Sequence, residues 1–128
     1  MTDVLLAAGV LQLASAALLG WVIALQRAQP EALKKIGVRV PRRIMQVHLD
    51  QVMMGLILLS VAVAFPDIPD VIAVLLLIGT VLNPLLFVPL AFAPKLDEGL
   101  PFRALTVTSF LIASGAFVSL AVWVLFGR

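Results

Sequence analysis

The sequence predicts an all-α membrane protein in which four transmembrane helices form a bundle. Hydrophobic residues make up 62% of the 128 residues, the mean hydropathy is +1.16, and only 12% of residues are charged. A soluble domain needs a larger polar share to cover its surface. A helix takes ~20 mostly apolar residues to cross a bilayer. The chain therefore has room for one domain of four spans.

Four apolar stretches give the expected spans, at about residues 3–26, 42–65, 70–92 and 101–126. The first has no basic segment before it and no clear cleavage site, so we expect a retained helix rather than a signal peptide. Loop one, residues 27–43, has a central part that can form a short surface helix, and Pro41 suits the first turn of the second span. Two prolines and two aspartates predict a tight turn at residues 66–70.

Basic residues lie almost entirely on one side of the predicted spans. Loop one and loop three (residues 93–101, with its flank) carry eight of the nine: Arg27, Lys34, Lys35, Arg39, Arg42, Arg43, Lys95 and Arg103. The positive-inside rule then places both loops in the cytoplasm and both termini outside. We expect an integral protein of the bacterial inner membrane whose basic loop can also contact anionic lipid, and no nucleic-acid partner.

His48 is the only histidine, and there is no cysteine or tyrosine. Thiolate metal sites and a phenolate haem ligand are thereby excluded. A zinc site needs three or four protein ligands, whereas one histidine can hold a haem because the porphyrin supplies four nitrogens. His48 is thus a candidate metal ligand about two turns inside the second span. The alternative is a structural histidine, hydrogen-bonded within the bundle or placed near the headgroups.

Residues near His48 in the second span define the expected site. At 100° per residue, Gln51 and Gly55 share the side of His48, and Gly55 is expected to leave a flat surface for a macrocycle. The methionines of this span are not placed to bind the opposite face of an iron, so we expect a protein ligand on one side only. Asp50 projects about 200° away from His48, which predicts another partner: Arg42, Arg43 or a neighbouring subunit.

Two prolines interrupt the third span beside a polar residue. Pro84 frees the carbonyl of Thr80, and Pro89 frees that of Leu85. One interpretation is a kinked helix in which Asn83 satisfies the freed groups. The other is a kink that opens a lateral pocket lined by Asn83. Small residues four apart in the first span, Ala16 and Gly20, and in the fourth, Gly115 and Ser119, predict close helix packing.

The segment 43–55 resembles helix two of the hydroxylaminobenzene mutases, in which an arginine is followed by H-L-E-G-V-M-N-G. The similarity rests on His48, Leu49, Asp50, Val52, Met53 and Gly55, with Asn83 similar to an asparagine of helix three. Styrene oxide isomerase is a more distant relative in the same group. The resemblance covers most of the chain at low similarity and implies a homotrimer with haem b between protomers and His48 as axial ligand.

In that family, ferric iron acts as a Lewis acid on the oxygen of an aryl hydroxylamine or epoxide, without net redox. Asn83, through the resemblance, and Gln51, which shares the side of His48, are candidate catalytic residues on the ligand side. Four positions depart from the family: Gln51 replaces a glycine, Met54 replaces an asparagine, and Gly79 and Phe87 stand where the isomerase has an aspartate and a tyrosine. Haem binding is therefore better supported than catalysis.

The function that the sequence favours is a haem-b-binding membrane isomerase or mutase acting on a small apolar, oxygen-bearing substrate. A small four-span transporter is one alternative, with Asp50 as its membrane-embedded acid. It ranks lower because such transporters commonly carry an acid midway along the first span, which here has only Asp3 near its start. A non-catalytic haem-binding or assembly protein is the other alternative.

Overall fold

The computed structural model describes residues 1–127, so Arg128, the one basic residue expected on the outer side, lies outside the described residues. The elements in chain order are α1 (Thr2–Ala28), α2 (Pro30–Lys35), α3 (Pro41–Ala64), α4 (Asp70–Leu85), α5 (Phe87–Phe92), the 3₁₀-helix η1 (Pro94–Glu98), α6 (Leu100–Val122) and the π-helix η2 (Trp123–Gly127). No strand occurs in residues 1–127, and the all-α prediction is confirmed.

Four helical segments are long and apolar enough to cross a membrane, which is compatible with an integral membrane protein. They are α1, α3, the combined segment of α4 and α5 (Asp70–Phe92), and α6 continued by η2 (Leu100–Gly127). Their ends differ from the expected ones by one or two residues at most. The short helix expected in loop one is α2.

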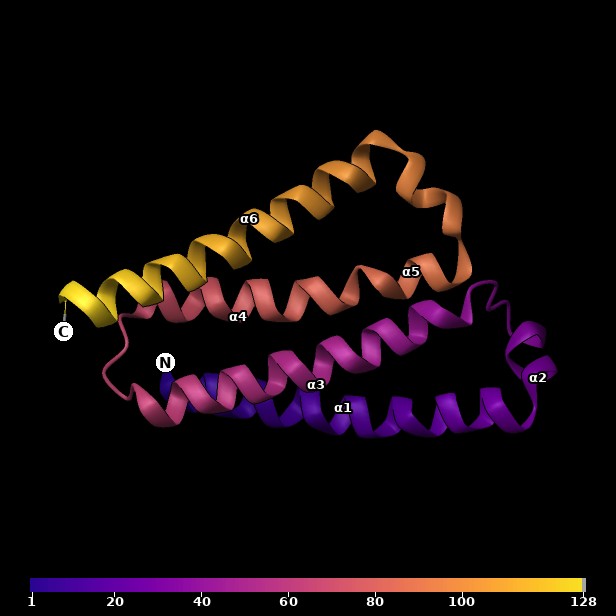
Figure 1. Cartoon of the computed structure of the whole chain (residues 1–128), viewed down its shortest axis with the longest axis horizontal. Helices are drawn as coiled ribbons and strands as arrows, with labels where there is room; N and C mark the ends of the chain where they lie inside the picture. The colour runs from indigo at the N-terminus through magenta and orange to yellow at the C-terminus, as the bar shows by residue number, and fades with distance from the viewer. Residues whose placement is uncertain (128) are drawn as a thin grey trace.

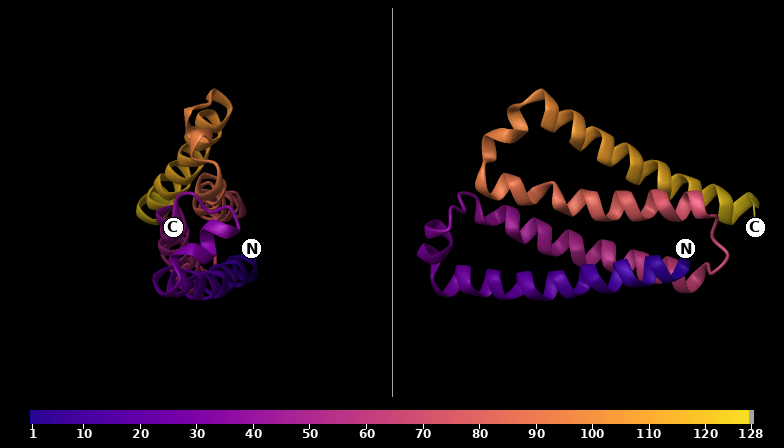
Figure 2. Two further views of the ribbon diagram at one scale, coloured as in Figure 1. Left: turned by 90° about the vertical axis from the view of Figure 1, so that its right-hand side faces the viewer. Right: turned by 180° about the vertical axis from the view of Figure 1, so that it is seen from behind.

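The four long segments pack mainly in chain order (Figures 1 and 2). The most extensive contact joins α1 to α3, α3 then packs on α4 and α5, and α6 packs on α4. Helices α1 and α6 therefore form the two edges of the arrangement. Large side chains on both edges, such as Trp21, Phe110 and Leu111, are exposed, as expected for surfaces that face lipid or another subunit.

The apolar core lies at the end of the molecule where the chain turns from α3 into α4. All four spans contribute to it, and its buried members are Leu5, Leu58, Val61, Ala62, Ile68, Ala73, Leu76 and Ala116. Phe65 and Trp123 meet edge to face there, with ring centroids 6.0 Å apart. Towards η1, α6 diverges from α4 (Figure 1). The helices are thus packed most tightly at the end that carries both termini.

Loop one is fixed to the end of α5 by backbone hydrogen bonds. The N–H groups of Arg39 and Val40 donate to the carbonyl oxygen of Ala91 at 2.8 and 3.0 Å. Gly37 has φ +94°, a left-handed conformation that favours glycine and ends the α2 turn. Pro41 then begins α3 in its first turn, as its fixed φ favours.

The interruption that the prolines predict in the third span lies at Leu86, between α4 and α5. The N–H of Leu86 is shared between the carbonyl oxygens of Leu82 (3.2 Å) and Asn83 (3.3 Å). The hydroxyl of Thr80 donates to the carbonyl oxygens of the preceding turn, at 2.6 Å to Leu76. The shared bond of Leu86 satisfies a backbone donor at the break, as an apolar environment requires, whereas the Thr80 hydroxyl bonds within α4 before it.

Glycines set the two closest helix contacts. A Cβ added to Gly9 of α1 would lie 2.9 Å from the carbonyl oxygen of Gly55 in α3, and one added to Gly79 of α4 would lie 2.8 Å from Cα of Ala113 in α6. Both pairs therefore pack backbone against helix surface, as small residues allow. Gly115, expected to make such a contact, has nothing within 4 Å of an added Cβ and makes none within the protomer.

Gly79→Val should lower the free energy of unfolding by about 1–3 kcal/mol, because the new side chain forces α4 and α6 apart. The matched control is Gly115→Val, which adds the same side chain to the same helix pair in open space and should change stability little. Unfolding of both variants in mixed micelles with increasing denaturing detergent, followed by circular dichroism, measures the difference. Equal stability of the two variants would contradict the close α4–α6 contact.

Candidate functional site

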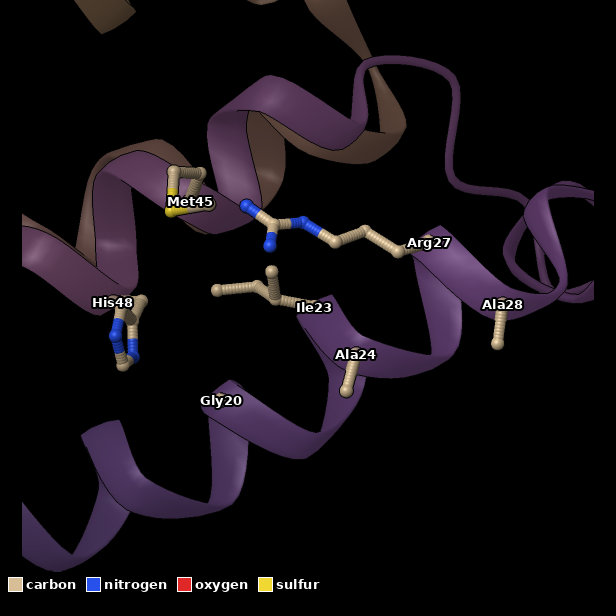
Figure 3. A pocket seen from close by; sticks show the side chains of 7 residues that line it. All are labelled: Gly20, Ile23, Ala24, Arg27, Ala28, Met45 and His48. Atoms are coloured by element: carbon tan, nitrogen blue, oxygen red, sulfur yellow. The ribbon is translucent and has the colours of Figure 1, made fainter.

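His48 lies seven residues inside α3, and its imidazole points towards α1 (Figure 3). Its Nδ1 lies 2.8 Å from the carbonyl oxygen of Ala16. Because a carbonyl oxygen only accepts, Nδ1 carries the proton in this hydrogen bond. In a neutral imidazole of this tautomer, Nε2 has a lone pair. One nitrogen of His48 is thus held by the backbone of α1, and the other remains available to a ligand.

The small residues of α1 leave room for the imidazole. Ala16 is buried, and a Cβ added to Gly20 would lie 3.7 Å from Cε1 of His48, at ordinary van der Waals contact. A side chain larger than alanine at position 20 would press on the ring. The spacing of Ala16 and Gly20, predicted to serve helix packing, therefore also allows the histidine ring to lie against α1.

A hollow of about 620 Å³ lies beside His48, between α1 and the first turns of α3 (Figure 3). We call it the histidine hollow. Its polar members are His48 at one end and Arg27 towards loop one, and the remaining lining residues are Gly20, Ile23, Ala24, Ala28 and Met45. It is open to the outside of the protomer, so a ligand or a second subunit can reach Nε2 from the side.

Gly55 does not form the flat, open surface that the sequence suggested. A Cβ added to it would lie 3.0 Å from the carbonyl oxygen of Gly9 and 3.1 Å from Cγ of Leu13. Helix α1 therefore fills the space beside Gly55, and the expectation of an empty face there is wrong. The physical reason is that the side of α3 shared by His48 and Gly55 is the side that packs on α1.

Asp50 pairs with Asn83 rather than with an arginine. Asn83 Nδ2 of α4 donates to Oδ2 of Asp50 at 3.2 Å. The expectation that Asp50 does not pair with His48 is confirmed, whereas the expected arginine partners are wrong. One of the two N–H groups of Asn83 Nδ2 is therefore donated to α3 rather than to the carbonyls freed by the prolines. The bond instead joins α3 to α4 across the centre of the molecule.

Arg43, in the first turn of α3, contacts η1 of loop three. Its Nη2 lies 3.7 Å from Oδ2 of Asp97 in η1, and its Nη1 donates to Oε1 of Gln46 at 2.9 Å. Its guanidinium carbon lies 5.8 Å from the ring centroid of Phe87. Arg43 thus holds loop three against α3. Its guanidinium pairs with these residues and not with Asp50.

The positions that depart from the mutase and isomerase pattern lie outside the histidine hollow. Gly79 packs on Ala113, where no longer side chain fits. Phe87 lies against Arg43, and Met54 is half-buried in α3. None of the three is among the residues that line the hollow beside His48.

Gln51 and Asn83, the candidate catalytic residues, are also outside the histidine hollow. Gln51 is buried and lines a second hollow of about 270 Å³ together with Gln12 of α1. Residues 81, 84 and 85 of α4 line this second hollow, whereas α4 contributes nothing to the first. The two hollows therefore lie on different sides of the α1–α3 contact. Sequence reasoning noted Gln12 as a polar residue in a span but could not place it opposite Gln51.

The described residues contain no group of three or more histidine, cysteine, aspartate or glutamate side chains placed to hold a metal ion. A metal bound by His48 alone would have to bring most of its own donors, as a porphyrin-bound iron does. Comparison with protein-family models, with curated proteins and with solved structures finds no match. The functional argument accordingly depends on the geometry of the site.

Asn83→Leu should lower the free energy of unfolding by about 0.6–1.7 kcal/mol, the range measured for hydrogen bonds between membrane helices. The double variant Asp50→Leu/Asn83→Leu should lose less than the sum of the two single variants, because the partners are removed together. Detergent unfolding of all four proteins gives the coupling energy. Strict additivity would mean that the bond between Asp50 and Asn83 contributes nothing.

Proposed function

We propose that this chain is an integral membrane protein that binds haem b through His48, with isomerase or mutase activity on a small apolar, oxygen-bearing substrate. The observation that carries the proposal is the hydrogen bond from Nδ1 of His48 to the carbonyl oxygen of Ala16. Metal-binding histidines typically donate their second ring N–H to a carbonyl or carboxylate, which fixes the tautomer and orients the ring. This arrangement presents Nε2 to the histidine hollow.

The histidine hollow suits a flat, largely apolar group. Its walls are Ile23, Ala24, Ala28 and Met45, and Gly20 adds no side chain opposite the imidazole. The open side matches a cofactor shared between protomers, as the resemblance to the mutase and isomerase group implies. A homotrimer would close the hollow with a neighbouring subunit, and the exposed edge formed by α1 supplies a surface for it.

Arg27 is the residue in the hollow that can bind the carboxylates of a haem. It lies seven residues from Gly20 in α1, which is about 10 Å along the helix axis at 1.5 Å per residue. No ion pair of Arg27 is formed within residues 1–127. A guanidinium binds a carboxylate through two parallel hydrogen bonds, so Arg27 can orient a haem whose iron lies at His48.

A ferric haem bound here would supply a Lewis acid for the oxygen of an epoxide or aryl hydroxylamine. In the chain, His48 would hold the iron while its Nδ1–H group donates to the carbonyl oxygen of Ala16, and the aliphatic residues of the hollow would contact the macrocycle. These properties suit a rearrangement in which no electrons are gained or lost overall. Gln51 and Asn83 lie outside the hollow of their own protomer, so their proposed role in catalysis requires the hollow of a neighbouring subunit.

The proposed orientation places loops one and three in the cytoplasm of a bacterium, with the protein in the inner membrane. The supporting observation is that α2 and η1 lie at the same end of the molecule, opposite the N-terminus (Figure 1). The eight basic residues of loops one and three are therefore gathered at one end. Such an excess of Lys and Arg is typical of cytoplasmic loops.

A non-catalytic haem-binding protein is the second candidate. The contact of Gly79 with Ala113 favours it, because this position cannot hold the aspartate that the isomerase carries. Incubation of the haem-loaded protein with phenylhydroxylamine and with styrene oxide separates the two functions. Formation of aminophenol or phenylacetaldehyde supports the enzyme, and haem binding without either product supports the second candidate.

The wild-type protein, purified from cells supplied with haem precursor, should show a Soret band. His48→Ala should reduce the haem content of the purified protein at least tenfold, because no other side chain in the hollow binds ferric iron well. Met45→Leu is the matched control and should retain the band. A wild-type protein without a Soret band, or an undiminished one in His48→Ala, would refute haem ligation by His48.

Arg27→Gln should raise the Kd for haem about two- to fivefold, as expected when an exposed ion pair worth up to about 1 kcal/mol is lost. Arg39→Gln, which removes an exposed arginine outside the hollow, should leave the Kd unchanged. Haem dimethyl ester, which lacks free carboxylates, should bind wild type and Arg27→Gln equally. Spectrophotometric titration of the detergent-solubilised apoprotein gives all the Kd values, and an equal effect of Arg27→Gln on haem and its ester would argue against the ion pair.

A further inference from the structure

Gln12 and Gln51, on the neighbouring helices α1 and α3, are two buried glutamines with side-chain atoms that have no hydrogen-bond partner within residues 1–127. Gln12 of α1 is only 7% exposed, and neither its Oε1 nor its Nε2 has a partner within residues 1–127. Gln51 of α3 is 9% exposed, and its Oε1 also has none. Buried amides are normally hydrogen-bonded, and this holds more strongly in an apolar surrounding. The two side chains therefore call for a polar partner that comes from outside the chain.

Both glutamines line the hollow of about 270 Å³ between α1, α3 and α4, which we call the glutamine hollow. The other lining residues are Ala8, Leu11, Ser15, Val81, Pro84 and Leu85. Leu11 and Leu85 are 67% and 47% exposed on the lateral surface of the helices. Since these two residues belong to the lining, the hollow is reached from the side, where lipid surrounds a membrane protein.

The charges around the glutamine hollow indicate a neutral occupant. No lysine, arginine, aspartate, glutamate or histidine is among its lining residues. Asp50, the neighbour of Gln51 in sequence, accepts a hydrogen bond from Asn83. A carboxamide offers both a donor and an acceptor, so a complementary group must also carry both.

The size and walls of the hollow favour an organic molecule over ordered water. One water takes about 30 Å³ of liquid volume and needs two to four polar partners to be held in a protein. The hollow is several times larger, and its polar lining side chains are Gln12, Ser15 and Gln51. A molecule with one polar group at the glutamines and an apolar body against Leu11, Val81 and Leu85 would contact both the polar and the apolar lining of the hollow.

We propose that the glutamine hollow binds a small, uncharged, lipid-soluble molecule whose polar group both donates and accepts hydrogen bonds, such as an aryl carboxamide. The site is separate from the proposed haem site, because the two hollows share no lining residue. Along α1, Ala16 lies between the residues that line the two hollows, and its carbonyl oxygen is hydrogen-bonded to Nδ1 of His48. Binding at the glutamine hollow therefore does not depend on His48.

The test is a titration of the detergent-solubilised full chain with 4-fluorobenzamide, followed by ¹⁹F NMR. The wild-type protein should give a saturable change, whereas 4-fluorotoluene, which has the ring without the carboxamide, should only partition into the micelles. Gln12→Leu and Gln51→Leu should each weaken binding at least fivefold. Gln29→Leu, at the exposed end of α1, is the matched control and should bind as the wild type does.

A second variant keeps the test valid if either glutamine replacement impairs folding. Leu11→Trp retains both glutamines but extends a large ring over the mouth of the hollow, and it should also weaken binding at least fivefold. His48→Ala should bind the probe normally, which separates this site from the haem proposal. Non-saturable partitioning in the wild type, or equal binding by wild type, Gln12→Leu and Leu11→Trp, would overturn the proposal and leave ordered water as the partner of the glutamines.

Discussion

The close contact between α1 and α3 is the constraint on which the site depends. Gly9 and Gly55 bring the two backbones within van der Waals distance, so every side chain along this contact must be small or must find space at its sides. His48 finds this space beside Gly20, and its Nδ1 is then close enough to bond the carbonyl oxygen of Ala16. In a bilayer, packing of this kind drives helix association, because the hydrophobic effect does not distinguish a neighbouring helix from lipid.

The histidine and glutamine hollows both lie beside the α1–α3 contact. Where Gly9 meets Gly55, the two backbones leave no room for a further side chain. Nearer to loop one, His48 and Met45 border one hollow, while Gln51 borders the other. Helix α4 covers the second side and contributes Pro84. No residue of α4 lines the hollow beside His48, so this side has no such cover within the chain, and it is the side to which the proposed cofactor is assigned.

Sequence reasoning predicted the fold class well, because hydropathy, charge and proline placement are local properties of the chain. It also separated Asp50 from His48 correctly by helical geometry. It failed at Gly55, where a glycine was assigned to a ligand although it serves a helix contact. It also did not predict the partner of Asp50 or the hollow that Gln12 and Gln51 share. The register between two helices depends on long-range packing, which a single sequence does not reveal.

The separation of Gln51 and Asn83 from His48 limits how a catalytic site can be completed. If both groups of residues act on one substrate, the residues must come from different protomers, because within one chain Gln51 and Asn83 do not line the hollow that His48 lines. A trimer satisfies this requirement if the open side of one histidine hollow packs against the α4 side of the next protomer. If the assembly does not bring them together, His48 holds its ligand without polar assistance, and Asn83 serves only to fix Asp50 between α3 and α4. For the proposed haem protein, the arrangement of subunits would therefore bear on catalysis in addition to the residues within one chain.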